Sequence, residues 1–362
     1  MNLLDLFSGI GGFHLGLERA GFEFDYVGFA EVDKYASAVY KYQFPIAEEL
    51  GDVKSIRPEN LPKIDIITFG SPCQDFSIAG KRAGATEGTR SSLIWEAIRL
   101  ITECKPRFFI WENVKGTFSS NNGADFWAII QAFTNIGSYR LEWQLLNTRW
   151  FLPQNRERLY LVGYTGDRGG QSVFPIGESG AISDNRKAKV ASTLQHTGHS
   201  GGNYRGMTMI ADYRIDEGLR LRRNNISPTL TSSKNSETQI SSMSPFVIKE
   251  ATKKGYAEAE VGDSINLSVP NSKTRRGRVG KGEAQTLDTG MQQYTIQSGI
   301  RRLTPVECMR LQGFPDNHNE FGLLDGKKVA ISDTQRYKQA GNAVTVDVVE
   351  AVAKKIYAVL HD

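Results

Sequence analysis

Cys73 is a thiol placed where sheet proteins bind their ligands. It follows the apolar run 64–69, which is typical of a buried strand in a parallel sheet, and Pro72 ends that strand because it cannot donate to the ladder. The carboxyl ends of parallel strands line the ligand crevice of open α/β sheets, and a thiolate there can act as a nucleophile. Considered alone, Cys73 is better explained as a small buried side chain that fills space.

Glu112, Arg156 and Arg158 are the side chains that could assist this thiol. Glu112 follows the next apolar run, 108–111, and adjacent parallel strands lie ~4.8 Å apart, so a thiol and a carboxyl could face one cleft. Arg156 and Arg158 alternate along an extended run and therefore share one face. A solvated loop acid and a surface charge run are the plain alternatives.

A glycine-rich turn, residues 5–12, follows the first predicted strand and would let the backbone approach a ligand closely. Its spacing is not the dinucleotide fingerprint, and it lacks the Lys-Ser/Thr pair of a P-loop, so a nucleotide phosphate is not indicated. Glu31, after the second strand, suits ribose hydroxyls, and Asp52, after the third, could accept from an adenine amino group. A ligand with ribose and adenine but no required phosphate is S-adenosylmethionine.

Short apolar runs alternate with amphipathic stretches over the first ~165 residues, which predicts a doubly wound, mostly parallel α/β sheet. The expected strands are Leu3–Phe7, Tyr26–Ala30, a short one ending near Gly51–Val53, 64–69, Phe108–Trp111, Leu141–Leu146 and Leu159–Gly163. The expected helices are one ending at Ala20, then Lys34–Tyr42, Ser92–Cys104 and Ala124–Phe133.

Residues 166–300 differ in character from the rest of the chain. They are rich in Gly, Ser, Thr and Asn, which predicts a second, smaller, loop-rich and mainly β domain, or an insertion into the first domain. The stretch 165–300 holds 18 Lys and Arg against 13 Asp and Glu, whereas the remainder holds 26 against 27, so the basic excess of the chain lies here. A phosphate-contacting surface and a merely solvated loop surface both fit this excess.

Ordered structure is expected again in residues 301–362. Thr304 and Pro305 are typical of a helix start, and that helix should end before Gly313. Residues 339–344 suggest a tight turn that opens a last helix, 347–359, whose apolar positions could dock on the first domain. The chain is therefore predicted to consist of three parts: a first domain, residues 1–165; a second, smaller domain, residues 166–300; and a C-terminal segment, residues 301–362, whose last helix returns to the first domain.

The composition excludes several protein classes. The chain has 362 residues and is 40% apolar, so a sizeable core can form. Three cysteines without paired spacing argue against a disulfide framework or a structural zinc site, and we expect no metal. We expect neither a signal peptide nor a membrane span, because no basic n-region or long apolar stretch is present. A reducing cytosol fits best.

Taken in order, these motifs make the chain resemble the prokaryotic DNA (cytosine-5) methyltransferases over nearly its whole length. Residues 5–12 look like the cofactor loop, 72–74 like the nucleophile motif, and 112–114 like the motif that holds the target base. Residues 154–158 match the family's Gln-x-Arg-x-Arg motif, 302–315 its segment after the variable region, and 341–342 its last motif. Ser71 and Asn155 depart from the commoner Phe and Lys at those positions.

The resemblance implies a mechanism. Cys73 would attack C6 of cytosine, so that C5 takes the methyl group of S-adenosylmethionine, and Arg156 could supply a positive field that stabilises the thiolate. A protonated Glu112 would bind N3, and Arg158 would hold O2 and fix Glu112. The target base must be flipped out of the duplex, and the loop 74–92 is long enough to close over it.

The resemblance also assigns residues and partners. The implied cofactor-binding residues are Phe7, Ser8, Gly9, Ile10, Gly12, Glu31, Val32, Asp52, Val53, Pro72, Leu93, Asn342, Ala343 and Val344. The candidates for DNA contact are Gln74, Ser77, Arg90, Arg275, Arg276, Arg278, Lys281, Thr286 and Leu287. Thr286-Leu287 matches the signature of the family's target-recognition domain, and similar Thr-Leu pairs occur at 193–194 and 229–230.

The expected partner is double-stranded DNA, bound by a cytoplasmic monomer of prokaryotic or phage origin, with a cognate restriction endonuclease as a second partner to consider. An RNA (tRNA) cytosine-5 methyltransferase is the first alternative, although that branch lacks a long variable region. A non-catalytic DNA-binding homologue is the second, and the intact Cys73, Glu112, Arg156 and Arg158 argue against it. An exocyclic-amine methyltransferase would carry a different residue at position 73.

Overall fold

The computed structural model describes residues 1–70, 92–119, 123–137, 139–165, 172–177, 210–214, 218–222, 246–269, 272, 274, 276–297 and 300–361. Several predicted site residues lie outside these ranges: Pro72, Cys73, Gln74, Ser77, Arg90 and Arg275. The Thr-Leu pairs at 193–194 and 229–230 and most of the loop 74–92 also lie outside them.

A seven-stranded sheet forms the centre of the molecule, with the strand order β3-β2-β1-β4-β5-β8-β6. Every neighbouring pair from β3 to β5 is parallel, and β8 runs antiparallel to both of its neighbours. The doubly wound, mostly parallel sheet is therefore confirmed. Its strands are β1 (Asn2–Leu6), β2 (Tyr26–Ala30), β3 (Glu48–Glu49), β4 (Ile66–Gly70), β5 (Phe108–Val114), β6 (Tyr139–Asn147) and β8 (Glu157–Thr165).

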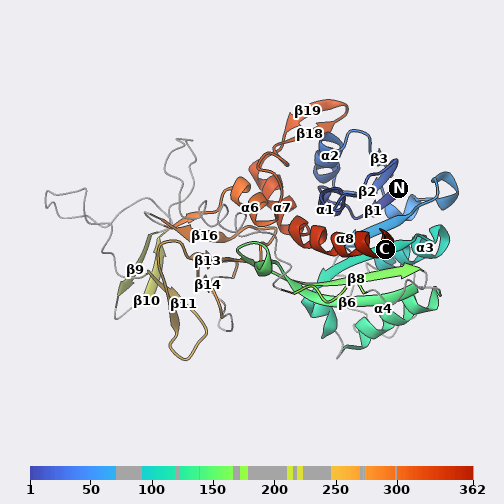
Figure 1. The fold of residues 1–362 in the computed structure, drawn as a ribbon. Helices are drawn as coiled ribbons and strands as arrows, with labels where there is room; N and C mark the ends of the chain where they lie inside the picture. Colours follow the sequence, from blue (N-terminus) through green and yellow to red (C-terminus); the bar gives the residue numbers. More distant parts are fainter. Residues whose placement is uncertain are drawn as a thin grey trace.

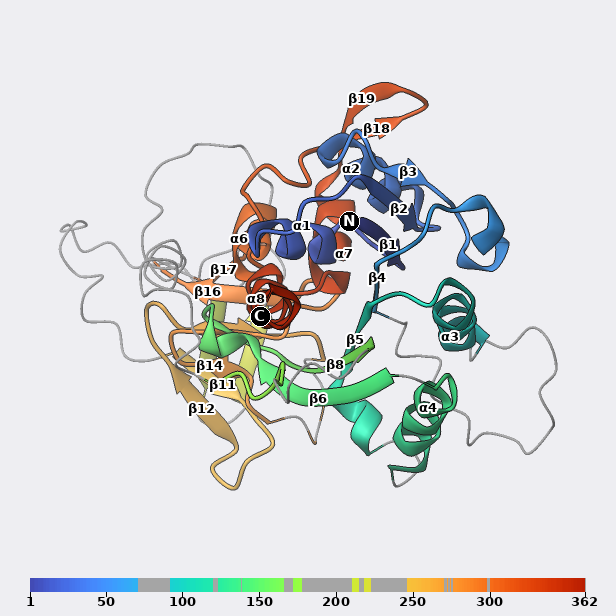
Figure 2. The same ribbon diagram turned by 45° about the vertical axis from the view of Figure 1, so that its right-hand side comes forward.

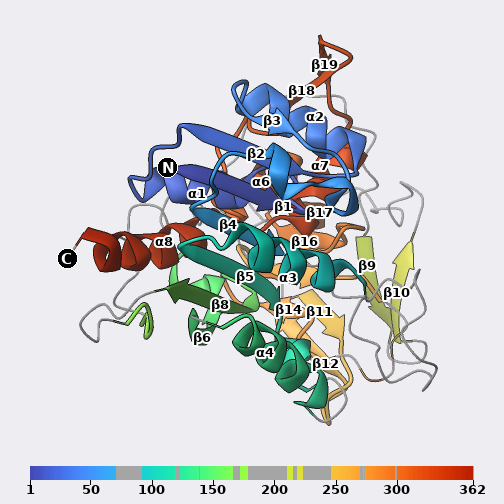
Figure 3. The ribbon, with the colours of Figure 1, turned by 90° about the vertical axis from the view of Figure 1, so that its right-hand side faces the viewer.

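Helices cover both faces of this sheet (Figures 1 and 3). One face packs against α1 (Gly12–Arg19), α2 (Lys34–Gln43) and α8 (Val346–His361), and the other against α3 (Ser92–Cys104) and α4 (Ala124–Asn135). Both faces are buried, so successive strand residues enter opposite cores: Phe108 and Ile110 join the first, Phe109 and Trp111 the second. Burial on both faces explains why the strand sequences are apolar almost without interruption.

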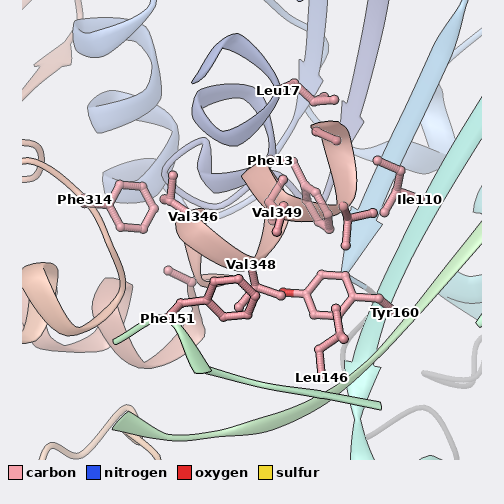
Figure 4. Close-up of a cluster of buried hydrophobic side chains, with 14 of the residues drawn as sticks. Phe13, Leu17, Ile110, Leu146, Phe151, Tyr160, Phe314, Val346, Val348 and Val349 are labelled. Carbon is pink, nitrogen blue, oxygen red and sulfur yellow. The ribbon is translucent and has the colours of Figure 1, made fainter. Parts of the chain in front are cut away.

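The C-terminal segment returns to the sheet, as Figure 2 shows. Helix α6 (Pro305–Leu311) begins with a capping box in which Thr304 and Glu307 bond each other's backbone N–H, and the hairpin β18 (Phe321–Leu324) and β19 (Lys327–Ala330) follows. Helix α8 then lies along α1, and Figure 4 shows Val346, Val348 and Val349 among the buried side chains of this core.

A smaller set of strands lies apart from the main sheet, at the left of Figure 1. It contains the sheet β14-β13-β16-β17 and two hairpins. Its members are β9 (Ile210–Arg214), β10 (Gly218–Arg222), β11 (Phe246–Lys249), β12 (Tyr256–Ala259), β13 (Ser264–Asn266), β14 (Val279–Gly280), β16 (Gln293–Ile296) and β17 (Ile300–Arg302). The parallel pair of β7 (Gln154–Asn155) and β15 (Ala284–Gln285) joins it to the larger part.

Three local expectations are corrected. The strand expected near Gly51–Val53 ends earlier, at Glu49, and Asp52 instead caps the 3-10 helix η1 (Val53–Ser55) by accepting from the N–H of Lys54. Glu112 lies inside β5 rather than after it, because β5 continues to Val114 alongside β8. Residues 339–342 form the last turn of helix α7 (Asp333–Asn342), not a separate tight turn. Among the described helices, none is long and apolar enough to cross a membrane.

Packing at the centre of the sheet predicts the effect of one substitution. A Cβ placed on Gly163 of β8 would overlap the ring of Phe109, which is fully buried beside it. Gly163→Ala should therefore lower the free energy of unfolding by about 1–3 kcal/mol, as overpacked core positions do. Urea denaturation followed by circular dichroism measures this change.

The matched control is Gly116→Ala, where the nearest atom to the new Cβ would be 3.9 Å away. This variant should leave the urea midpoint unchanged or raise it slightly. Equal midpoints for the two variants would contradict the packing argument.

Candidate active site

A cavity of about 670 Å³ opens at the carboxyl edge of the parallel strands. Its wall combines residues that follow β1, β2 and β3 with the ends of β4 and β5, the arginines of 156–158 and the end of α7. Thirteen of the predicted site residues line it: Phe7, Gly9, Ile10, Glu31, Val32, Asp52, Val53, Leu93, Glu112, Arg156, Arg158, Asn342 and Ala343. The topology of the sheet therefore gathers residues from 7 to 343 at one place.

Glu31 ties the two loops at one end of this cavity. Its carboxylate accepts a hydrogen bond from the Gly9 N–H at 2.8 Å and another from the Asp33 N–H at 2.8 Å. Burial raises the pKa of the Glu31 carboxyl, and these backbone bonds oppose that rise. Glu31 lines the cavity, where its carboxylate could also accept from ribose hydroxyls.

The loop between β1 and α1 needs unusual backbone conformations. Phe7, Gly9 and Gly11 have φ values of 51°, 56° and 85°. Glycine adopts such values freely, but a phenylalanine at positive φ costs about 1–2 kcal/mol. Because Phe7 also lines the cavity, the loop holds a strained residue at the ligand site.

Three residues predicted to bind cofactor are displaced from the cavity wall. Ser8 is buried, and its N–H donates to the Ala30 carbonyl at 3.1 Å. Gly12 and Val344 pack against each other, since a Cβ on Gly12 would lie 2.6 Å from Val344 Cγ2. These residues shape the site from behind rather than facing it.

Helix α7 forms another part of the wall and closes onto α2. Lys338 forms a 2.5 Å ion pair with Asp33, and the Gln339 side chain donates to the Tyr35 carbonyl at 3.2 Å. Both Lys338 and Asp33 line the cavity. The sequence indicated neither residue, because contacts between segments about 300 positions apart leave no local pattern.

Glu112 and Arg158 form an ion pair at the end of the cavity nearest β4. Arg158 Nε lies 3.1 Å from Glu112 Oε1, and the two side chains are only 16% and 11% exposed. Glu112 pairs in register with Gly70, the last residue of β4, and a Cβ on that glycine would lie 3.3 Å from Glu112 Oε2. The glycine leaves space for the carboxyl beside the strand that leads to Cys73.

Arg156 is held differently from Arg158. It is buried, and its guanidinium donates to the carbonyls of Ala343 at 2.9 Å, Gly341 at 3.4 Å and Leu287 at 3.5 Å. Burial, together with the neighbouring charge of Arg158, lowers the pKa of Arg156 to about 9. Arg156 therefore fastens the end of α7 to the sheet, a contact that its predicted role near the thiolate did not include.

Two buried glutamines connect this region to the smaller strands. Gln154 donates to the Leu311 carbonyl at 2.8 Å and accepts from the Leu287 N–H at 3.2 Å. Gln312 donates to the Ala340 carbonyl at 2.7 Å and accepts from the Thr345 hydroxyl at 2.9 Å. We refer to Gln154, Arg156, Gln312 and Thr345 as the polar junction.

The residues predicted to contact DNA lie in different surroundings. Thr286 and Leu287 lie beside the polar junction: the Thr286 hydroxyl donates to the Asn155 carbonyl at 2.8 Å, and Leu287 is buried. Arg278 is only 2% exposed and donates to the Val269 carbonyl, so it lies inside the small sheet and not on its surface. Arg276 is exposed, and Lys281 is exposed but paired with Asp263 at 2.7 Å.

The donor set in the described ranges contains no group of three or more His, Cys, Asp or Glu side chains that could hold a metal ion. The groups around the cavity instead suit an adenosine ligand: carboxylates at Glu31 and Asp52, an exposed apolar Val32, and a narrow loop built on Gly9. These residues fit S-adenosylmethionine.

Known proteins give the same assignment. A family model described as C-5 cytosine-specific DNA methylase matches residues 1–358. The chain is 30% identical to the type II methyltransferase M.Bsp6I of Bacillus sp. (strain RFL6), over 99% of this chain and 98% of that protein. It is 29% identical to the orphan methyltransferase M.SPRI of Bacillus phage SPR, covering 98% and 97%.

Among solved structures, the Dnmt2 methyltransferase of S. pombe shares the fold with a TM-score of 0.62 at 17% identity, over 100% of both chains. The family match and the full-length relatives agree with the sheet topology and the cavity. The chain belongs to the C-5 cytosine-specific DNA methylase family.

Proposed function

We propose that the protein is a sequence-specific DNA cytosine-5 methyltransferase that uses S-adenosylmethionine and the nucleophile Cys73. The observation that carries the proposal is the Glu112–Arg158 ion pair, which opens onto the cavity beside the last residue of β4. The family match supports methyl transfer, and the residue roles below are our inference.

The ion pair suits recognition of a cytosine edge. A protonated Glu112 would donate to N3 of the base and so accept the electron density that attack at C6 pushes into the ring. Arg158 Nε contacts Glu112 Oε1, which orients the carboxyl, and the rest of the guanidinium can donate to O2. Because both side chains are mostly buried, their interactions with a flipped base would be strong.

The cofactor would lie at the opposite end of the cavity. Glu31 would bind ribose hydroxyls, Val32 would contact the adenine face, and the Phe7–Gly12 loop would approach the remainder. Bound there, S-adenosylmethionine supplies the methyl group. The protein's contribution is to hold the base edge at Glu112 and the loop at Glu31 in one cavity, which aligns the reacting groups.

DNA is the substrate that we favour over RNA. Residues 166–300 make up more than a third of the chain and hold its basic excess, and we propose that they form the target-recognition domain. Arg276 is an exposed basic residue of this stretch, and its Nε donates to the Ala251 carbonyl at 3.0 Å. The relatives M.Bsp6I and M.SPRI, a type II and an orphan methyltransferase, support a bacterial or phage origin. We propose that the protein acts in the cytoplasm, with or without a restriction partner.

Covalent trapping tests the nucleophile. Duplex DNA that contains 5-fluorocytosine should form a stable adduct with the protein and S-adenosylmethionine, because the fluorine cannot leave as a proton does. We expect peptide mapping to locate the adduct at Cys73, and Cys73→Ser to abolish it. Cys104→Ser is the control, since that thiol lies on α3 and burial raises its pKa to about 11. Failure to trap any pool of genomic DNA would contradict the proposal.

Substitution of the acid tests the role of the ion pair. Glu112→Gln should lower kcat by about 10²–10⁴-fold, the usual contribution of a general acid, with a smaller change in the KM for S-adenosylmethionine. Tritium transfer to DNA measures both constants.

Glu157→Gln is the matched control for this substitution. Glu157 lies on the same strand as Arg158, and its carboxylate pairs with the exposed Lys115 at 2.8 Å. That variant should stay within about threefold of the wild type, because exposed ion pairs contribute little. Equal losses in the two variants would remove the special role of Glu112.

A further inference from the structure

A chain of hydrogen-bonded side chains runs under the cofactor loop, and the mechanism above does not use it. Asp5 accepts from the Thr68 hydroxyl at 2.7 Å and lies 3.3 Å from the Tyr40 hydroxyl. Tyr40 lies 3.1 Å from His14 Nδ1, and His14 Nε2 lies 3.2 Å from Glu18 Oε1. Asp5 is completely buried, whereas the Glu18 side chain is 45% exposed. The chain therefore joins a buried carboxyl to solvent.

Aromatic packing holds the chain in one geometry. The ring of Tyr40 stacks on Phe29 with centroids 4.1 Å apart, and the ring of His14 stacks on Phe44 at 4.0 Å. The cofactor loop rests directly on this cluster, since a Cβ on Gly11 would lie 3.1 Å from Tyr40 Cε2. The chain and the loop are thus parts of one packed unit.

Asp5 faces no cation among the described residues. The groups that act on it are Thr68 on β4, Tyr40 on α2, and Glu31 after β2, and Glu31 is itself an acid. Further along the chain of hydrogen-bonded side chains, His14 and Glu18 lie on α1. A buried carboxylate without a positive partner is so costly that the group holds its proton instead. Burial, with a smaller contribution from the charge of Glu31, accordingly raises the pKa of Asp5 to about 8.

The neutral form satisfies every group in the chain. Asp5 then donates to the Tyr40 oxygen, Tyr40 donates to His14 Nδ1, and His14 Nε2–H donates to Glu18. Loss of one proton reverses the inner bonds: Tyr40 donates to Asp5, and His14 Nδ1–H donates to Tyr40. Each step breaks one O–H or N–H bond and forms the next, and His14 Nε2–H gives the proton to solvent at Glu18. The inner bonds from Asp5 to His14 exist in both states, whereas His14 Nε2 changes from a donor to Glu18 into an acceptor toward solvent. Because only this outermost, solvent-facing bond is exchanged, the hydrogen-bonded chain can pass a proton either way.

The cavity lies close to Asp5, so a charge in the cavity can act on the proton of this carboxyl. Phe7, two residues after Asp5, lines it, as does Glu31, whose charge acts on Asp5. The cofactor and the product of a methyltransferase differ in charge at the reacting sulfur. S-adenosylmethionine carries a sulfonium cation, whereas S-adenosylhomocysteine carries a neutral thioether. A cation in the cavity favours an ionised carboxylate nearby, and a thioether does not.

We propose that Asp5 is a specificity-determining residue that favours the sulfonium cofactor over its thioether product by giving up a proton through Tyr40, His14 and Glu18 when the cofactor binds. The inference rests on the proposed use of S-adenosylmethionine. It assigns the protein a means of releasing product, since loss of the methyl group removes the positive charge and Asp5 takes its proton back.

The sign of the pH effect follows from linkage. Binding that releases a proton strengthens as pH rises, so affinity for S-adenosylmethionine should increase by up to about tenfold per pH unit below pH 8. Above pH 8 Asp5 is already ionised in the free protein, and the increase should stop. Affinity for S-adenosylhomocysteine should stay nearly constant over the same range.

Isothermal titration calorimetry in two buffers with different ionisation enthalpies counts the protons. At pH 7 the wild-type protein should release protons with S-adenosylmethionine and almost none with S-adenosylhomocysteine. Asp5→Asn keeps a side chain that can bond Thr68 and Tyr40 and should abolish the difference between the ligands. Asp65→Asn, at the opposite end of the sheet, is the matched control and should retain it.

Two results would decide against the inference, and a third would decide against the proposed function on which it rests. Equal proton release with both ligands in the wild type would overturn it without any variant, so the test does not depend on the folding of Asp5→Asn. A ligand difference that persists in Asp5→Asn and disappears in Glu31→Gln would assign the proton to Glu31. Failure of both ligands to bind at all would instead overturn the proposed function.

Discussion

The polar junction is the constraint on which the rest of the structure depends. A polar side chain taken out of water must find partners, and an unpaired one costs about 1–3 kcal/mol. Gln154 and Gln312 are both fully buried, and their partners come from Leu287, Leu311 and Ala340. If any one of these segments moved away, buried polar groups of the others would lose their hydrogen-bond partners. The junction therefore holds distant parts of the chain in a single arrangement.

This constraint positions the site. Arg156 of the junction bonds the carbonyls that end α7, and the same stretch of chain presents Asn342 and Ala343 to the cavity. Gly341 is required there, because a Cβ would lie 2.6 Å from the carbonyl of Asp288. The cavity wall, the recognition signature Thr286-Leu287 and the Gln-x-Arg-x-Arg motif are therefore one contiguous piece. Displacement of residues 284–287 would therefore also displace part of the cavity wall.

The sequence predicted the fold where periodicity was strong and local. The strand at 26–30 and the helix at 92–104 matched to the residue, because a continuous apolar run and helical spacing leave clear patterns. Prediction from the sequence failed where contacts with distant segments determine the local structure. The strand β5 extends over Glu112 because β8 continues beside it. Arg278 is buried because Val269 accepts its hydrogen bond. Thirteen site residues at the cavity were predictable from motifs, whereas Lys338, Gln312 and the chain under Asp5 depend on tertiary contacts.

The short pairing of β7 with β15 has a consequence for how such proteins diversify. The chain leaves the main sheet at Thr165, and the backbone N–H groups of Phe174 and Ile176 still bond side chains of β6. Further along, Ala284 pairs with Gln154, which lies only a strand's length from Thr165. The cost of closing a loop grows slowly with its length, so the intervening stretch can be lengthened, shortened or exchanged while the catalytic fold stays closed. The two-residue parallel ladder of β7 and β15 is thus a short, fixed attachment, and the stretch between Thr165 and Ala284 could differ among related proteins without a change in the main sheet.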